Sequence, residues 1–169
     1  MRPLHPANVA TAGGNPDVVR KVGATEARKV QFLGVESYHD SSSGSERGAN
    51  VIFCFSLDGI CVCHLGDLGH NLGPEDQVQI GPVDILLVPV GGNFTIDAGI
   101  AADLCRKIAP SVAIPMHYRN EKCQDFPVAG VEDFLQLMKN VIRNDVSETM
   151  LEKDSLPEAT QVIVLKPAL

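Results

Sequence analysis

Histidine and aspartate side chains follow three apolar, strand-like runs of this sequence, within residues 37–40, 64–70 and 114–118. In layered α/β proteins, side chains at strand ends converge although they lie far apart in the sequence. Imidazole and carboxylate groups are ligands that a cation such as zinc takes, and two cations can share a bridging carboxylate. The pattern therefore indicates a metal site of His and Asp side chains, although any one of these histidines alone is more often an ordinary hydrogen-bonding residue.

Glycines stand at two of the predicted strand ends. Gly66 precedes Asp67, and an Asp beside a Gly is also ordinary turn chemistry. Gly91 and Gly92 follow a long apolar run, where they form either a tight corner or a place where the backbone approaches a ligand closely. The residues alone leave both alternatives open.

Apolar patterns predict the elements that must position these side chains. Two β-branched or aromatic runs, residues 50–57 and 60–64, predict a hairpin around Asp58 and Gly59. The continuous apolar run at residues 84–90 is typical of a strand covered on both faces. The other expected elements are strands at residues 30–38, 112–115 and 161–165, a short helix opening at 73–76, and helices at 97–108 and 131–142. This order predicts an α/β layer architecture with mixed strand pairing.

Length and charge limit the function classes. The chain has 169 residues, which suits one domain with its own core rather than two catalytic domains. The formal charge of -7 and the lack of a dense basic cluster disfavour nucleic-acid binding. The longest apolar stretch, residues 85–90, is too short to span a membrane, and no apolar run follows Arg2 as in a signal peptide. We therefore expect a cytoplasmic protein whose partner is a small molecule or a protein.

The five cysteines are expected to be structural. Cys54, Cys61 and Cys63 lie inside apolar runs, and the sequence contains no C-x-x-C pair. Small buried thiols are common in such runs. We therefore favour free thiols over a metal or disulfide role.

Several segments resemble the motifs of a known family, and they follow one another in the order found in that family. They are residues 37–40 with 47–48, 64–70, 84–92 with 94–95, and 114–118. From about Gly13 to the C-terminus, the sequence resembles the Zn-dependent hydrolase branch of the metallo-β-lactamase superfamily. The resemblance implies an αββα sandwich, in which two mixed sheets pack face to face with helices outside. Residues 1–169 are then a single domain with an atypical start at residues 1–12.

The resemblance also implies roles for individual residues. His39 and His117 resemble imidazole ligands of the first and second metal positions, and Asp67 resembles the carboxylate that bridges both. Asp67 and His117 are the expected catalytic residues. Five further residues are expected to border the substrate cleft or to support the ligands: His64, His70, Gly91, Gly92 and Thr95.

The chemistry that follows from the resemblance is hydrolysis of a small molecule by a metal-activated water. A divalent cation lowers the pKa of its bound water to about 7 and polarises the bond that is attacked. Zinc is the expected ion, and manganese, iron and nickel are the other ions that His and carboxylate ligands accept.

One part of the family pattern is missing from the start of the chain. The H-x-H-x-D-H motif should precede residues 13–16, and His5 and Pro6 stand where its Asp and last His are expected. Without this motif each metal position keeps two protein ligands, fewer than the three of a typical catalytic zinc site. Three interpretations are open: an N-terminally truncated chain, a degenerate non-catalytic relative, or a protomer completed by another chain. We favour the first, because His39, Asp67 and His117 persist while the loss is confined to one end.

The alternative function is a non-catalytic binding or assembly module derived from the same fold. The strands that precede the missing motif in relatives are expected to be absent as well. Their absence would expose a sheet edge and part of an apolar face, which favours pairing between chains. This alternative predicts a homo-oligomer.

Overall fold

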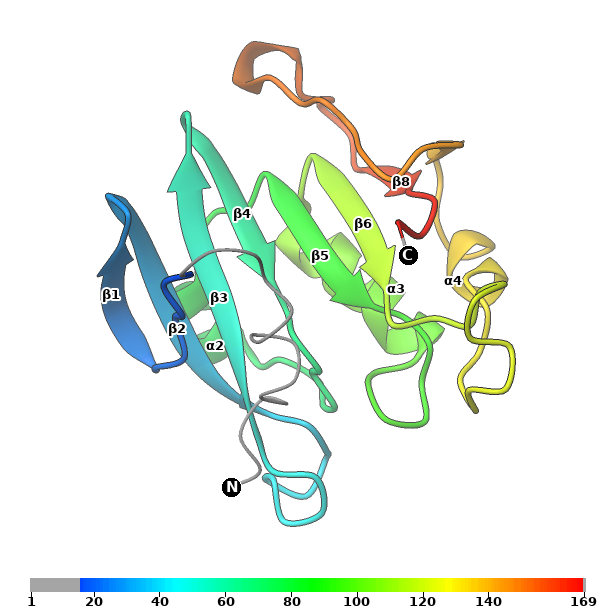
Figure 1. Ribbon diagram of the computed structural model, residues 1–169, viewed down its shortest axis with the longest axis horizontal. Helices are drawn as coiled ribbons and strands as arrows, with labels where there is room; N and C mark the ends of the chain where they lie inside the picture. The colour runs from blue at the N-terminus through cyan, green and yellow to red at the C-terminus, as the bar shows by residue number, and fades with distance from the viewer. Residues whose placement is uncertain (1–15, 169) are drawn as a thin grey trace.

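The computed structural model describes residues 16–168, which form a single mixed sheet with helices on one face (Figure 1). The sheet order is β1-β2-β3-β4-β5-β6-β8-β7. Its strands are β1 (Gly23–Ala27), β2 (Val30–Tyr38), β3 (Ala49–Leu57), β4 (Ile60–His64), β5 (Ile85–Pro89), β6 (Val112–Met116), β7 (Val141–Arg143) and β8 (Gln161–Val164). The helices are α2 (Pro74–Ile80), α3 (Ala98–Ile108), α4 (Glu132–Leu135) and the 3₁₀-helix η1 (Lys153–Ser155).

The direction of the strands explains where their ends lie. β1 to β4 form an antiparallel meander, whereas β4, β5, β6 and β8 are paired in parallel. Because β2 and β4 are each antiparallel to β3, both run in the same direction as β5 and β6. The carboxyl ends of β2, β4, β5 and β6 therefore meet at one edge of the sheet, at the lower side of Figure 1.

The predicted hairpin between β3 and β4 is confirmed. Asp58 and Gly59 connect the strands, and both have positive φ, 49° and 79°. Leu57 pairs with Ile60 in the register. This is the backbone conformation that a two-residue type I′ turn requires.

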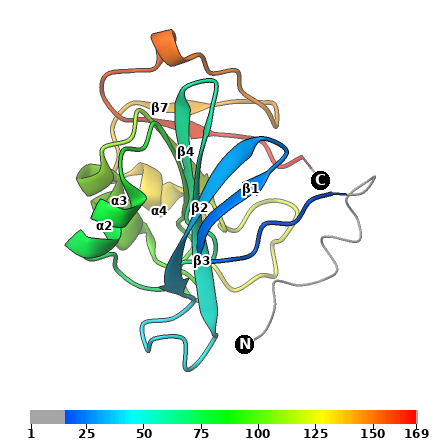
Figure 2. The same ribbon diagram turned by 90° about the vertical axis from the view of Figure 1, so that its left-hand side faces the viewer.

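Helices α2, α3 and α4 cover one face of the sheet, as Figure 2 shows. Helix α3 begins where predicted, because the carboxylate of Asp97 accepts a hydrogen bond from the N–H of Ile100 at 2.9 Å. Its buried face contacts side chains that point to the same side of β4, β5 and β6 and includes Ala101, Ala102, Leu104 and Cys105. This contact forms the main apolar core.

The opposite face of the sheet carries a smaller apolar cluster. Ile60, Ile85, Val112 and Ile163 are buried there, under side chains from the connection between β7 and β8. The α/β class and the mixed pairing are confirmed. Residues 16–168 contain one sheet, so the second sheet of the expected sandwich is not seen in the part of the chain that the structure describes.

The helix predicted at residues 131–142 is wrong in its extent. Helix α4 covers Glu132–Leu135 only, and the backbone at Asn140 is left-handed, with φ 51°. After this turn, Val141 pairs with Val162 in a parallel ladder between β7 and β8. The helical spacing of apolar residues continued past Asn140 by coincidence, and the β-branched Val141 and Ile142 belong to a strand. Strand β1 and helix η1 were not predicted.

The cysteine and membrane predictions can be compared with the structure. All five thiols are free, but only Cys63 and Cys105 are buried, and the others are partly exposed. Between residues 16 and 168, no helix has the length and apolar character needed to cross a membrane.

Candidate active site

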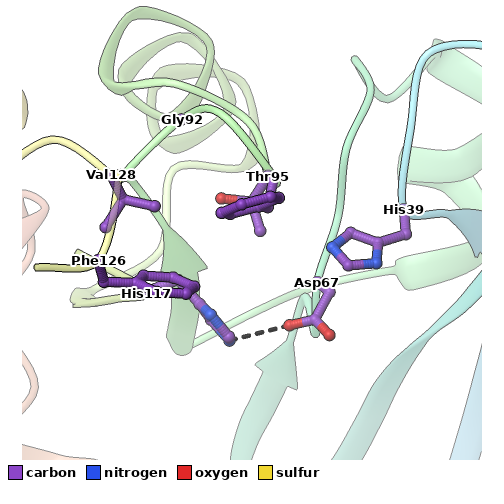
Figure 3. A pocket seen from close by; sticks show the side chains of 8 residues that line it. His39, Asp67, Gly92, Thr95, His117, Phe126 and Val128 are labelled. Atoms are coloured by element: carbon purple, nitrogen blue, oxygen red, sulfur yellow. Dashed lines mark ion pairs between the residues drawn. The ribbon is translucent and has the colours of Figure 1, made fainter. Parts of the chain in front are cut away.

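His39, Asp67 and His117 line one pocket at the edge where the parallel strand ends meet (Figure 3). They follow β2, β4 and β6, respectively. The pocket has a volume of about 170 Å³. Of the other predicted residues, Gly92 and Thr95 line the same pocket, whereas His64 and His70 do not.

Asp67 and His117 are in direct contact. His117 Nε2 lies 3.0 Å from Asp67 Oδ1, and the two side chains are 45% and 40% exposed. The hydrogen bond from His117 lowers the pKa of Asp67 below its ordinary value, against the opposite effect of partial burial. His39 and His64 contribute to the same lowering. Asp67 is therefore an anion at neutral pH, surrounded by imidazoles.

The loop after His39 is organised by the buried carboxylate of Asp40. Four backbone N–H groups donate to it, at 2.7 to 3.1 Å, and they belong to Ser42, Gly44, Glu46 and Arg47. Burial raises the pKa of Asp40, but these four donors outweigh it and bring the pKa to about 2. The N–H of His39 also donates to the carbonyl of Gly48 at 3.0 Å. Asp40 therefore fixes the loop that leaves the pocket at His39.

The turn that carries Asp67 is held by Asn50, at the start of β3. Asn50 Oδ1 accepts a hydrogen bond from the N–H of Asp67 at 3.0 Å. The amide nitrogen of Asn50 donates to Ser37 Oγ at 2.7 Å and to the carbonyl of Leu65 at 2.9 Å. One side chain thus connects the end of β2 with the loop after β4. Sequence reasoning missed both Asn50 and Asp40; an Asp at the entry of a Gly- and Ser-rich loop is a recognisable signal for the latter.

Two glycines let main-chain segments approach the candidate histidines closely. A Cβ added to Gly91 would lie 2.0 Å from the carbonyl oxygen of His117. A Cβ added to Gly69 would lie 2.3 Å from the carbonyl carbon of His39. Of the two alternatives for Gly91, the structure supports close approach, but to the backbone of His117. Gly92 has φ 66° and takes the corner, where a side chain would be strained.

His70 supports the site through the backbone. Its Nε2 accepts a hydrogen bond from the N–H of Tyr38, the residue before His39, at 3.1 Å. Its Nδ1 lies 2.8 Å from the carbonyl oxygen of Asn71, so the proton sits on Nδ1. His70 therefore holds the end of β2 in place.

His64 points to the other face of the sheet. It lines a separate hollow, together with the aromatic rings of Phe32, Phe53 and Phe55. Its Nδ1 accepts a hydrogen bond from the N–H of Gly66 at 2.9 Å. Burial lowers the pKa of His64, and the nearby His117 adds to this effect, so His64 is neutral.

The apolar wall of the pocket was not predicted from the sequence. Phe94, Phe126 and Val128 line it, on loops after β5 and β6. Phe126 and Val128 lie on the side of the pocket away from His39 (Figure 3). These residues stand in irregular segments without periodicity, and only the adjacency of Phe94 to Thr95 was a signal.

The donor types at the pocket suit a divalent cation, but their arrangement does not complete a metal site. Asp67 Oδ1 and His117 Nε2 contact each other in this structure. Within residues 16–168, no group of three or more His, Cys, Asp or Glu side chains could hold a metal ion. His5 and Pro6, which stand where part of the missing N-terminal motif is expected, lie outside the described residues. The three residues therefore fit a metal ion in kind but not in number or spacing, and a site needs further ligands.

The chain is similar to curated proteins that are named as metal-dependent hydrolases. A metal-dependent hydrolase of the UPF0173 family from Carboxydothermus hydrogenoformans is 46% identical over 86 residues, 48% of this chain and 38% of the relative. One from Pyrococcus furiosus is 34% identical over 98 residues, 57% of this chain and 44% of the relative. One from Saccharolobus solfataricus is 35% identical over 122 residues, 70% of this chain and 49% of the relative. The chain thus spans about half the length, or less, of these curated relatives.

Solved structures show the same fold. A Thermotoga maritima protein assigned to the Zn-dependent hydrolases of the metallo-β-lactamase superfamily superposes with a TM-score of 0.71 and 36% identity, over 88% of this chain and 71% of that one. A metallo hydrolase from Ignicoccus hospitalis shares the fold, with a TM-score of 0.56 and 20% identity, over 96% of this chain and 62% of that one. The family model for the β-lactamase superfamily domain matches residues 4–117. On this evidence, the chain belongs to the β-lactamase superfamily domain family.

Proposed function

We propose that this chain supplies part of the active site of a metal-dependent hydrolase, with His39, Asp67 and His117 as metal ligands. The observation that carries the proposal is their position in one pocket, after three different strands. Family membership and similarity to proteins named as metal-dependent hydrolases support the same conclusion. The substrate is a small molecule, and a divalent metal held by these residues together with further ligands would supply an activated water for its hydrolysis.

Residues around the pocket keep Asp67 ionised and hold the loops of two candidate ligands in position. Asp67 is kept ionised by the hydrogen bond from His117. The side chains of Asn50 and Asp40 hold the loops of Asp67 and His39 through backbone groups. Loop positions fixed in this way reduce the entropy lost when ligand atoms gather around one centre.

Further ligands are needed to complete the metal site. With two imidazoles and one carboxylate, of which two contact each other, the affinity for an ion is expected to be low. Zinc as the ion, a cytoplasmic location and a homo-oligomer remain predictions.

Metal uptake by the full chain tests the proposal. The zinc affinity of the natural chain and of Asp67→Asn is measured by titration at equilibrium with free zinc. We expect the Asp67→Asn variant to bind zinc at least about tenfold more weakly. Asp103→Asn is the matched control, because Asp103 is exposed on α3, away from the pocket. Equal zinc binding by the natural chain and Asp67→Asn contradicts the proposal.

A second candidate function is an assembly module, and exposed apolar side chains at the sheet margins favour it. Val141 and Ile142 on β7 are 37% and 43% exposed, and β7 is the last strand of the sheet. An edge strand with exposed apolar residues can pair with another chain. Light scattering at micromolar concentration tests this function: it predicts an oligomer, and a monomer contradicts it.

A further inference from the structure

The apolar wall of the pocket suggests what kind of substrate the site takes. We propose that Phe94, Phe126 and Val128 form a subsite for a planar apolar group about the size of one aromatic ring. The substrates are then molecules that carry such a group beside the bond to be hydrolysed. The second statement rests on the proposed hydrolase function, whereas the binding of the apolar group does not.

The exposure of Phe126 is the first observation. Its side chain is among the large hydrophobic residues that water reaches, with 51% of the residue exposed. Its ring lies 5.4 Å from the ring of Phe94, centroid to centroid, with a tilt of 34°. Apolar side chains that remain exposed beside a polar site are typical of ligand-binding grooves. A third ring added to this pair would gain both apolar burial and aromatic contact.

The wall is held in a defined position relative to His117. The N–H of Ala129 donates to the carbonyl of Gly91 at 2.8 Å, and Asn93 Nδ2 donates to the carbonyl of Pro127 at 2.9 Å. These bonds tie the loop of Phe126 to the loop of Phe94. Gly91 in turn packs on the backbone of His117. The wall therefore belongs to the same rigid unit as one of the candidate ligands.

Arg47 supports the wall from the loop that follows His39. Its guanidinium carbon lies 5.7 Å from the centroid of the Phe94 ring, within cation–π range. The wall is thus in contact with the second loop that carries a candidate ligand. Ring-shaped ligands would contact a surface that is already formed, which reduces the entropy cost of binding.

The pocket is large enough for a single aromatic ring. The pocket volume is about 170 Å³. An apolar cavity of about 150 Å³ is large enough to bind benzene. The pocket therefore has room for one ring.

Binding of an inert probe tests the subsite without any hydrolysis. The probe is 4-fluorobenzyl alcohol, whose affinity for the full chain is measured by ¹⁹F NMR titration. We expect Phe126→Ala to weaken the affinity about three- to tenfold, which is the typical worth of an aromatic contact beyond area burial. Phe126→Leu should weaken it less, because Leu keeps an apolar side chain in the wall. Val78→Ala is the matched control, because Val78 is 82% exposed on α2, and it should leave the affinity unchanged.

The subsite is contradicted if the natural chain does not bind the one-ring probe, or if Phe126→Ala binds it equally well. The latter would place the probe elsewhere, for example in the hollow lined by Phe32, Phe53 and Phe55. The probe is not hydrolysed and supplies no ligand of the metal site. This result is therefore independent of metal uptake. A chain that binds the probe but takes up no metal contradicts the hydrolase function alone.

Discussion

The carbonyl oxygen of His117 lies so close to the Cα of Gly91 that any side chain at position 91 would overlap it, with a Cβ–oxygen distance of 2.0 Å. Gly91 stands two residues after the end of β5, and His117 directly follows β6. The contact therefore sets the distance between two neighbouring loops at the pocket. It also predicts that adding a single methyl group at position 91 destabilises the chain.

Gly91→Ala is expected to destabilise the chain by about 1–3 kcal/mol, because the backbone of His117 must move to make room. Urea denaturation followed by circular dichroism measures the change in the free energy of unfolding. Gly130→Ala is the control, because a Cβ at position 130 would meet nothing within 4 Å. A Gly91→Ala variant as stable as Gly130→Ala would show that the two loops are not in close contact.

Asn50→Ala is expected to cost about 1–3 kcal/mol, because it removes three hydrogen bonds that tie Asp67 and Leu65 to Ser37. The same urea denaturation measures this loss. Asn71→Ala serves as the matched control, since Asn71 is exposed. If the two variants are equally stable, Asn50 does not hold the Asp67 turn.

Acid stability depends on Asp40, whose pKa falls from 3.8 to about 2 on folding. Because the folded state binds the proton more weakly, the ionised carboxylate stabilises the chain above pH 4, and this contribution is lost as the pH falls from about 4 to 2. Asp40→Asn should lower the unfolding midpoint at pH 7 and show a smaller further loss between pH 4 and 2. Thermal unfolding across this pH range checks the prediction, with Asp125→Asn as an exposed control. Parallel pH profiles for the natural chain and Asp40→Asn would contradict the role of Asp40.

Much of the fold could be predicted because local signals and the tertiary structure agree. Asp58 and Gly59 predicted the hairpin from turn chemistry, and Asp97 caps α3 where the apolar spacing begins. The helix predicted at residues 131–142 was wrong in extent because the spacing of Leu135, Met138 and Ile142 fits a helix. In the structure, pairing with β8 places Ile142 in a strand. The local spacing of apolar residues does not show whether a segment pairs with a distant strand.

Some residues of the candidate site could be predicted from the sequence, and others could not. That His39, Asp67 and His117 meet could be predicted, because strands that run in the same direction end at one edge. Their choice over His64 and His70 came from the family resemblance. Phe94 and Phe126 could not, because their contact depends on how two irregular loops fold over each other. His64 lies near Asp67 and His117, yet it lines the hollow of Phe32, Phe53 and Phe55 rather than the pocket, a difference that its position in the sequence does not predict.

The claim that His39 and His117 bind a metal ion beside Asp67 can be tested most directly by histidine-ring NMR during a zinc titration. The ring nitrogen signals of all five histidines are followed in the natural chain and in Asp67→Asn. The account predicts that zinc shifts the signals of His39 and His117 in the natural chain and leaves those of His70 unchanged, because His70 already bonds Tyr38 and Asn71. The shifts should require higher zinc concentrations in Asp67→Asn. Zinc-dependent shifts confined to other histidines, or unaffected by Asp67→Asn, would contradict the account.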